Sequence, residues 1–451
     1  MVVDVTLRNA RISGQVRDLH IIEGVLAERS ALGADRVDLD GMTVLPGLHD
    51  HHIHLAAAAA SAQSVSLGPQ VLASGGGLAG VLRAARRRQP SGWLRGVGYD
   101  LTQSGWIDRR DLDSAQVGPV RVQDRTGSRW VIDSSGLTQV LSRGPWPDGV
   151  QRDPSGRPTG HLVRLDAWLR DRLPPREGLD WAGLGRELAA LGITAVTDAG
   201  HLNDLSTAQM LAGSPLPQRI RMMTAEPVFG AGRETVGRVV LDAVKVVLDD
   251  DRLPALETLR AVVDVARSAG RGVAIHCVTD LQLGLAMAAG LGRGDRVEHA
   301  NVVPDGYARL LAEAGVAVCS QPGLISARGD RYLDEVAPDR CHELFRLRTL
   351  QGAGVVLLGG SDAPVGPISP WLGVEAAVSR TTGQGHRFGV SEALPRAAAL
   401  GMYLRGGERS WPRRSLRPGQ PADLLVMGGS GPFAPEVVAT LIGGDIVHGA
   451  L

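Results

Sequence analysis

The residues best suited to chemistry lie in the segment Pro46-Gly-Leu-His-Asp-His-His-Ile-His-Leu55. Because side chains alternate along a strand, residues i and i+2 face the same side, so His52 and His54 point together while Ile53 points away. Two imidazoles that project from the end of one strand can clamp a divalent metal ion. A His-x-His pair by itself is a weak signal, since many such pairs are packed or solvated.

Three further residues of ligand type follow apolar runs that are typical of strands. His276 follows Gly-Val-Ala-Ile, His299 follows Arg-Val-Glu, and Asp362 follows Val-Val-Leu-Leu-Gly-Gly-Ser. Each has an ordinary explanation, as a buried histidine bonded to a carbonyl or an aspartate that caps the next helix. In a TIM barrel, however, the carboxyl ends of the strands converge on one mouth. Four strand ends that each present a zinc-compatible ligand are hard to obtain by chance.

The elements that must position these residues alternate between apolar, β-branched runs and helical stretches. This rhythm is typical of βα units around a parallel sheet and predicts an α/β fold, a (β/α)₈ TIM-like barrel. Helices are expected at 254–269, near 307–314 and near 344–353. Strands are expected at 193–197, 243–248, 273–277, 296–300, 316–320 and 355–358, with two more at 44–53 and 119–123.

The two ends of the chain contain short strands and turns without long helices. We expect residues 1–46 and 416–451 to form a small composite β domain, of β-sandwich type, and residues 47–415 to form the barrel. Gly/Pro-rich Leu416-Arg-Pro-Gly-Gln-Pro421 marks the return into the β domain. Segments around 68–118 and 140–185, rich in Gly, Pro and Trp, are expected to be loops and helices that cover the barrel mouth.

The composition excludes several classes of function. Lys plus Arg and Asp plus Glu number 48 each, so neither nucleic acid nor an anionic membrane is indicated as a partner. No apolar run approaches the ~20 residues of a membrane span, and the N-terminus lacks the features of a secretory signal. Cys277, Cys319 and Cys341 lack the spacing of a disulfide framework or a structural zinc site. We therefore expect a cytoplasmic protein with a small-molecule substrate, and a homo-oligomer is compatible with the sequence.

The order His-x-His, Lys, His, His, Asp resembles that of the amidohydrolase superfamily of metal-dependent hydrolases. The similarity is closest to the branch that includes N-substituted formamide deformylases, and it extends over essentially the whole chain. Pro418-Gly-Gln-Pro-Ala-Asp-Leu-Leu425 carries it in the terminal domain. The motifs that carry it in the barrel are Val44 to Leu55, Val244-Lys-Val-Val-Leu-Asp249, Ile275-His-Cys-Val-Thr-Asp280, Arg296-Val-Glu-His-Ala300, Ser320-Gln-Pro322 and Gly360-Ser-Asp-Ala-Pro-Val365.

This resemblance implies a metal-dependent hydrolase acting on carbon–nitrogen bonds other than peptide bonds. His52 and His54 would bind the more buried ion with Asp362 nearby, while His276 and His299 would bind a second ion or orient the substrate. We expect one or two Zn²⁺ ions, which lower the pKa of bound water toward neutrality and polarise the carbon under attack. Asp362 is the candidate general base that carries the proton from water to the leaving nitrogen.

Lys245 is the only lysine in a chain that otherwise uses arginine for every basic side chain. The resemblance includes it among the metal ligands. Unlike arginine, a lysine amine of lowered pKa can react with carbon dioxide to give an anionic carbamate, which is able to bridge two metal ions. The alternative is an ordinary lysine, paired with Asp249 or Asp362 beside a single ion. We favour the carboxylated lysine.

The chain departs from the pattern of its branch at one position expected near the substrate. The branch usually shows Asp-Gly-His before an Asn-Ser pair, whereas this chain reads Thr126-Gly-Ser128 and then Asp133-Ser134, so Ser128 replaces the histidine. The formamide substrate is therefore not inherited. Weaker candidates for substrate contact, chosen because they fall in or near predicted loops, are Tyr99, Arg125, His201 and Arg348.

Three classes of function remain open at this point. The first is hydrolysis of an amide, carbamate or cyclic amide, and the second is hydrolytic deamination at an amidine, guanidine or heterocycle carbon. Both use the same metal and water, so the sequence barely separates them. The third is a non-catalytic barrel that serves as a scaffold, and the occupied ligand positions argue against it.

Overall fold

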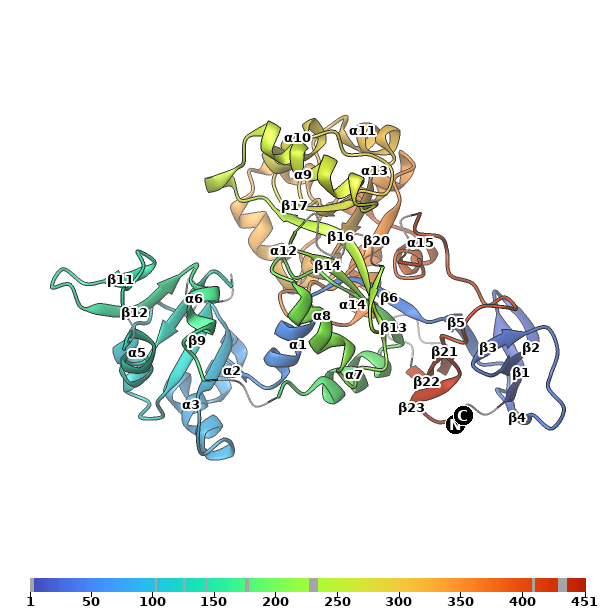
Figure 1. The fold of residues 1–451 in the computed structure, drawn as a ribbon, viewed down its shortest axis with the longest axis horizontal. Coiled ribbons are helices and arrows are strands. Elements are labelled where there is room, and N and C mark those ends of the chain that lie inside the picture. The colour runs from blue at the N-terminus through green and yellow to red at the C-terminus, as the bar shows by residue number, and fades with distance from the viewer. Residues whose placement is uncertain are drawn as a thin grey trace. The chain divides into compact units, whose positions relative to one another are not determined.

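The computed structural model describes residues 4–101, 104–124, 127–142, 144–174, 178–226, 234–407, 410–428 and 436–451 (Figure 1). The chain divides into two compact units. The first joins Met1–Leu55 to Trp181–Leu451, and the second is Ala56–Asp180. Among the described residues, no helix combines the length and the apolar character needed to cross a membrane.

The core of the first unit is a nearly closed barrel of eight parallel strands. In spatial order they are β6 (Leu48–Ile53), β13 (Ile193–Asp198), β14 (Arg219–Thr224), β16 (Val239–Val247), β17 (Val273–Cys277), β18 (Arg296–His299), β19 (Ala317–Ser320) and β20 (Leu357–Gly359). Just beyond β20, the Asp362 amide donates to the His52 carbonyl at 2.7 Å and the His54 amide donates to the Ala363 carbonyl at 3.0 Å. These bonds join the last barrel strand to the first. A short β15 (Thr235–Val236) also pairs with β16.

Burial explains why most barrel strands are near-continuous apolar runs. Every residue of β6, β13, β18 and β19 is buried, as expected where a parallel sheet is covered on both faces. Strands β6 and β18 nevertheless contain histidine, arginine, aspartate and glutamate. Burying such groups costs free energy unless they are paired or bound, so their partners need to be identified.

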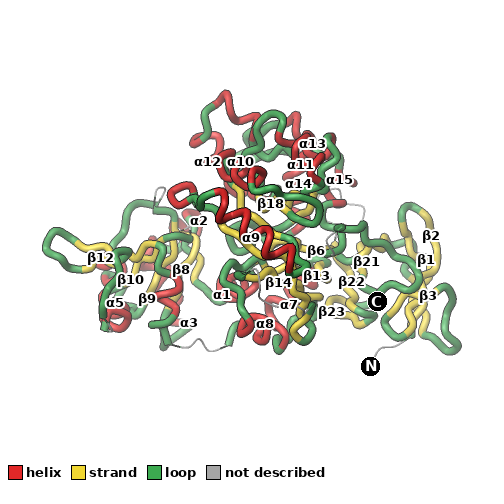
Figure 2. Tube along the Cα trace, turned by 45° about the horizontal axis from the view of Figure 1, so that its top comes forward, coloured by secondary structure: helices red, strands yellow, loops and turns green. Residues whose placement is uncertain are grey.

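Helices lie outside the barrel strands, with α9 crossing in front of them in Figure 2. In α9 (Leu256–Ser268), Leu259, Val263 and Ala266 are buried at helical spacing, so one face packs inward and the rest is solvated. The other helices of this unit are α7 (Trp181–Ala190), α8 (Leu205–Ala212), α10 (Asp280–Ala288), α11 (Tyr307–Ala314), α12 (Gly323–Glu335), α13 (Leu347–Gly352), α14 (Pro370–Ser379) and α15 (Arg396–Gly401).

Strands from both ends of the chain, blue and red in Figure 1, form one mixed sheet in the same unit. Its order is β23-β22-β21-β5-β1-β2-β3, with β4 paired to β1. The antiparallel pairing of β5 with β21 joins the two ends of the chain. The strands are β1 (Val5–Ile12), β2 (Gln15–Ile22), β3 (Val25–Ala27), β4 (Asp35–Asp38), β5 (Thr43–Pro46), β21 (Leu424–Gly428), β22 (Glu436–Ile442) and β23 (Asp445–Gly449). The fold class is thus a TIM-like barrel with a terminal sheet domain, as predicted, and the exact domain boundaries stay a prediction.

The second unit contains a six-stranded sheet that the sequence analysis did not anticipate. The predicted strand 119–123 is present as β9, but it belongs to this sheet and not to the barrel. The strands in spatial order are β11 (Val150–Arg152), β12 (Pro158–Val163), β10 (Arg129–Ile132), β9 (Val120–Asp124), β8 (Leu94–Tyr99) and β7 (Val65–Ser66). Its helices are α2 (Pro69–Ser74), α3 (Gly77–Arg88), α4 (Arg109–Asp113), α5 (Ser134–Leu141) and α6 (Asp166–Arg170), and α1 (Leu55–Ala62) begins at the boundary.

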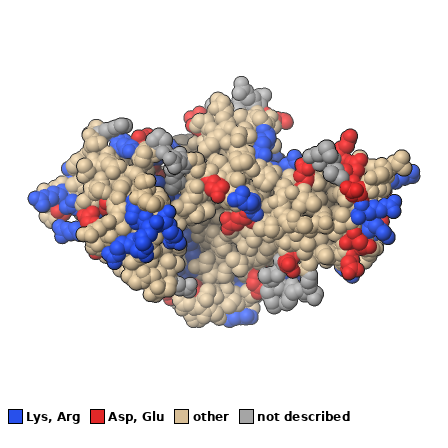
Figure 3. Space-filling model, turned by 90° about the horizontal axis from the view of Figure 1, so that it is seen from below, with Lys and Arg blue, Asp and Glu red and all other residues tan. Residues whose placement is uncertain are grey.

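Charged side chains of both signs lie on the face drawn in Figure 3, with a larger basic group on the left of the view. On the face drawn in Figure 3, basic and acidic groups both lie among larger uncharged areas. This distribution fits the zero net charge of the chain.

Candidate metal centre

The imidazoles singled out from the sequence meet at the carboxyl ends of the barrel strands. The His52 ring lies 5.4 Å from the His54 ring and 4.8 Å from the His299 ring, measured between centroids. The His276 ring lies 4.5 Å from the His299 ring. Residues that are more than two hundred positions apart therefore form one cluster, because the barrel brings the ends of β6, β17 and β18 together.

Asp362 supplies a carboxylate to this cluster. Its Oδ1 lies 3.1 Å from Nε2 of His54 and 3.5 Å from Nε2 of His52. The ligand atoms of the three residues all lie within 4.8 Å of one another, a spacing at which they can share one ion. Burial raises the pKa of Asp362, but the hydrogen bond from His54 and the nearby His52 and His299 outweigh it, so the pKa lies well below its ordinary range. The group is a carboxylate, as a metal ligand or a proton acceptor must be.

Two residues of the cluster have a backbone conformation that side chains rarely adopt. The φ angle is 71° at His299 and 55° at Asp362, both in the left-handed region. Such strain persists only where the surroundings hold it in place, and it gathers at functional sites. Here the hydrogen bond from the Asp362 amide to the His52 carbonyl fixes the turn that aims the carboxylate.

Three histidines of the cluster, His52, His276 and His299, are neutral at pH 7. Burial is the main cause that lowers the pKa to about 4 in His52, about 4 in His299 and about 2 in His276. Nearby positive charge, including that of Lys245, lowers all three further. A neutral imidazole has a free lone pair, which is the form that binds a metal ion.

Residues behind the histidines fix which ring nitrogen faces the cluster. Nδ1 of His52 is hydrogen bonded to the carboxylate of Glu298, and Nδ1 of His299 lies 2.8 Å from Oε1 of Gln321. Since an ionised carboxylate and an amide oxygen only accept, each Nδ1 carries the proton and each Nε2 is left as the acceptor. Arg296, whose Nε is 2.5 Å from Glu298 Oε1, neutralises the buried carboxylate.

Sequence reasoning did not select Glu298, Arg296 or Gln321 as functional residues. A signal was present, because Arg-Val-Glu-His puts charged groups into a strand in which every residue is buried. The sequence could not show which histidine Glu298 contacts. That histidine is His52, which lies 246 positions away.

Lys245 lies in β16 with its ammonium nitrogen buried and without a hydrogen-bond partner among the described residues. Burial lowers its pKa, and the positive charge of Arg296 adds to this effect against the opposing charge of Glu298. An amine of lowered pKa spends more of its time uncharged, which makes it more nucleophilic.

The donor set fits a divalent metal ion. Nε2 of His52 is buried and makes no hydrogen bond in the described structure, which is costly unless another partner is bound there. Imidazole nitrogens with a carboxylate oxygen are ligands that zinc accepts and that other first-row metals share.

The weaker substrate candidates divide between the two units. Tyr99, in the second unit, is buried, and its hydroxyl lies 3.1 Å from the carbonyls of Ser104 and Gly105, so it is held by its own loop. Ser128 also belongs to the second unit, where its carbonyl accepts from the Arg164 amide at 2.8 Å. In the first unit, His201 is exposed after β13, and Arg348 is exposed on α13. Arg125 lies outside the described residues. No contact assigns substrate binding to these side chains, and their roles stay predictions.

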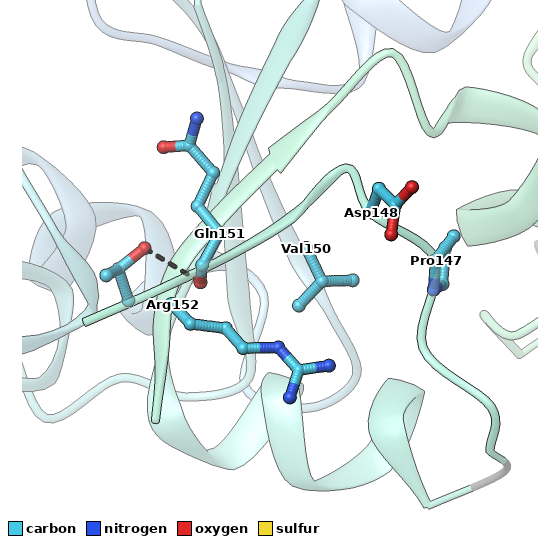
Figure 4. Close-up of a pocket in the computed structure, with 6 residues that line it drawn as sticks. Pro147, Asp148, Val150, Gln151 and Arg152 are labelled. Atoms are coloured by element: carbon cyan, nitrogen blue, oxygen red, sulfur yellow. Dashed lines mark hydrogen bonds between the residues drawn. The ribbon is translucent and has the colours of Figure 1, made fainter. Parts of the chain in front are cut away.

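A separate hollow of about 670 Å³ lies on the second unit beside β11 and β12 (Figure 4). Pro147, Asp148, Val150, Gln151, Arg152 and Thr159 line it, and the Thr159 hydroxyl donates to the Gln151 carbonyl at 3.2 Å. With one carboxylate and no histidine or cysteine, this lining cannot hold a metal ion as the barrel cluster can.

Comparison with known proteins agrees with this geometry. A model of the amidohydrolase family matches residues 35–448. The chain belongs to the amidohydrolase family. A putative amidohydrolase, YtcJ, from Bacillus subtilis (strain 168) is 26% identical over 92% of this chain and 90% of its own length. An N-substituted formamide deformylase from Arthrobacter pascens is 27% identical over 88% of this chain and 85% of its own length.

A solved structure supports the fold of this amidohydrolase independently. An uncharacterized metal-dependent hydrolase from Pyrococcus horikoshii OT3 superposes with a TM-score of 0.76 at 22% identity, over 94% of this chain and 97% of the other. At that identity the similarity concerns the fold. The activity follows from family membership, which makes this chain a metal-dependent hydrolase that acts on carbon–nitrogen bonds.

Proposed function

We propose that this amidohydrolase cleaves the carbon–nitrogen bond of an amide, carbamate or cyclic amide in a small molecule. The observation that carries the proposal is the meeting of His52, His54 and Asp362 at one point, with a buried imidazole nitrogen that has no hydrogen bond. A relative named N-substituted formamide deformylase supports an amide over an amidine, although Ser128 argues against the same substrate.

The protein residues would divide the work as follows. His52 and His54 hold the more buried ion with Asp362 beside it, and His276 and His299 hold a second ion or orient the substrate. Zn²⁺ is the expected ion, and when bound it would acidify water and polarise the carbon under attack. Asp362 would accept a proton from the attacking water and donate it to the leaving nitrogen, a role that needs a carboxylate within hydrogen-bond reach of both atoms.

We further propose that Lys245 carries a carbamate. The amine attacks carbon dioxide, a C–N bond forms, and one proton leaves to solvent, so a neutral amine becomes an anion. That anion would bridge two ions and remove the repulsion between an ammonium and a divalent metal. The lowered pKa of Lys245, and the lack of a hydrogen-bond partner for its Nζ among the described residues, support this assignment.

The proposal is tested by measuring bound metal and turnover together. The purified enzyme is assayed for metal by mass spectrometry and for activity on N-acyl amines, N-acyl amino acids, hydantoin-like rings and aminated heterocycles. Release of a carboxylate or a ring-opened acid is expected, whereas release of ammonia from the heterocycles alone would assign a deaminase. His54→Ala should lose metal and turnover, and His448→Ala in β23 should keep both. A metal-free wild type inactive on the whole panel would favour a scaffold.

A further inference from the structure

A second cavity, of about 510 Å³, lies in the first unit at the opposite end of the barrel. Its lining includes the first residues of β14, the start of β6 and the residue before β16, whereas the candidate metal ligands lie at the carboxyl ends of the strands. Residues 406–407 and several residues of 412–423, which precede the terminal strand β21, supply the other wall. Nothing in the proposed hydrolysis uses this cavity.

The cavity is strongly basic. Among the described residues that line it, five carry guanidinium groups and one, Asp423, carries a carboxylate. The five are Arg219, Arg221, Arg238, Arg413 and Arg414. Behind the wall, Asp242 pairs with Arg221 at 3.0 Å. Within the described part of the chain, two carboxylates therefore accompany five guanidinium groups, an excess that stands out in a chain whose net charge is zero.

The pairings within the cavity leave this excess in place. Arg219 and Arg414 both pair with Asp423, at 3.3 and 3.4 Å. Among the residues that the structure describes, Arg238 donates to uncharged oxygens, those of the Leu216 carbonyl and, at 3.2 Å, the Gln218 carbonyl. Burial and the charge of Arg219 both lower the pKa of Arg238, as expected for a cation beside another cation.

One of these guanidinium groups, that of Arg414, is also held in place before any ligand binds. Arg414 donates to the Gly47 carbonyl at 2.5 Å and to the Thr194 hydroxyl at 3.0 Å. A fixed planar donor set matches the oxygens of a phosphate, and the rotamer entropy of the side chain has already been lost. The remaining lining includes apolar Pro46, Ala195, Ile220 and Val240, which suit an organic group.

We propose that this cavity binds a small organic phosphate, with the phosphate group among the arginines and the organic group against the apolar wall. A phosphate offers close to two negative charges at neutral pH and several acceptor oxygens, which offsets the excess of cations better than a single carboxylate does.

The test is calorimetric titration of the metal-loaded enzyme with phenyl phosphate and, separately, with inorganic phosphate. Saturable binding is expected for both, and it should be tighter for phenyl phosphate because only the ester reaches the apolar wall. Arg238→Gln combined with Arg413→Gln removes two cations for which the described residues provide no acidic partner. Affinity for phenyl phosphate should fall by about tenfold or more in this double variant.

The matched control is Arg309→Gln, which removes an exposed arginine of α11 that pairs with Glu313 and should leave binding unchanged. If the double variant unfolds, Arg413→Gln alone gives the same test, because that side chain is exposed. If phenyl phosphate binds the double variant and Arg413→Gln as tightly as it binds the wild type, phosphate would be assigned to the metal centre and the proposal overturned. No saturable binding, or equal affinity for the two probes, would overturn it as well.

Discussion

His52 contacts a different acid at each nitrogen of its ring. Glu298 accepts from Nδ1, whereas Asp362 lies 3.5 Å from Nε2, on the side of the other ligands. Glu298 pairs with Arg296 and is fully buried, so it orients the imidazole without contacting solvent. Asp362 also reaches His54 and remains slightly exposed, which suits a group that meets water and substrate. Two carboxylates around one histidine can therefore serve different purposes.

Replacing Asp362 with asparagine keeps the side-chain volume but removes the proton acceptor. We expect turnover to fall by ~10²-fold or more, with most of the bound metal retained because the histidines remain. Steady-state kinetics and metal analysis of the same sample check this. Turnover near that of the wild type would move proton transfer to another residue.

Glu298→Gln tests the orientation of His52. The amide can still accept from Nδ1, but it no longer carries the charge that makes the imidazole a stronger ligand and compensates Arg296. Loss of such a partner typically weakens metal affinity by about 10- to 100-fold. Competition with a chromophoric chelator measures this, and thermal unfolding shows how much the uncompensated arginine destabilises the fold. An unchanged metal affinity would restrict Glu298 to pairing with Arg296.

At the level of elements, the sequence was most informative where apolar runs are continuous and bounded by glycine. Strand β17 and helix α11 have the bounds expected of them, and β18 ends one residue early. Strand β14 was missed because Arg219 and Arg221 interrupt its apolar pattern. Both arginines line the basic cavity. At these positions the residues that suit the proposed phosphate site are not those that an apolar strand pattern favours.

The sheet of the second unit was missed for a different reason. Its strands are short, and glycines interrupt them, as in Leu-Arg-Gly-Val-Gly-Tyr of β8. Their pairing partners are set by tertiary contacts that local propensity does not encode. The metal centre was easier to predict from the sequence, since the strand ends of a barrel converge wherever they lie in the chain. The bonds that orient its ligands connect strands across the barrel, and only the structure supplies them.

Strand β16 provides the element-scale test, because it brings the single lysine to the cluster. If Lys245 carries a bridging carbamate, Lys245→Arg should be inactive, since a guanidinium neither reacts with carbon dioxide nor binds a cation. Lys245→Ala should be partly rescued by short carboxylic acids that fill the space and supply the missing anion. The wild type should hold close to two metal ions per chain. One tightly bound ion, an unmodified lysine mass and no dependence on bicarbonate would reject the carbamate and leave the hydrolase assignment intact.

At the scale of the whole molecule, all proposed metal ligands belong to one of the two units. His52, His54, Lys245, His276, His299 and Asp362 lie within Met1–Leu55 and Trp181–Leu451. The second unit has its own sheet and its own buried apolar clusters, such as that around Leu94, Val120 and Val131. A ligand that binds only one unit stabilises that unit directly.

Removing the metal should therefore lower the unfolding temperature of the first unit and leave that of the second unit unchanged. We expect two calorimetric transitions, of which only that of the first unit falls by several degrees on chelation. Occupancy of a site at about 100 times its Kd contributes about 2.7 kcal/mol to the folded state. In His54→Ala the transition of the first unit should no longer respond to the chelator, because the ion no longer binds. A single transition that moves as a whole would mean that residues 56–180 and the barrel unfold as one cooperative body, and that the stability of the metal centre depends on the packing of both.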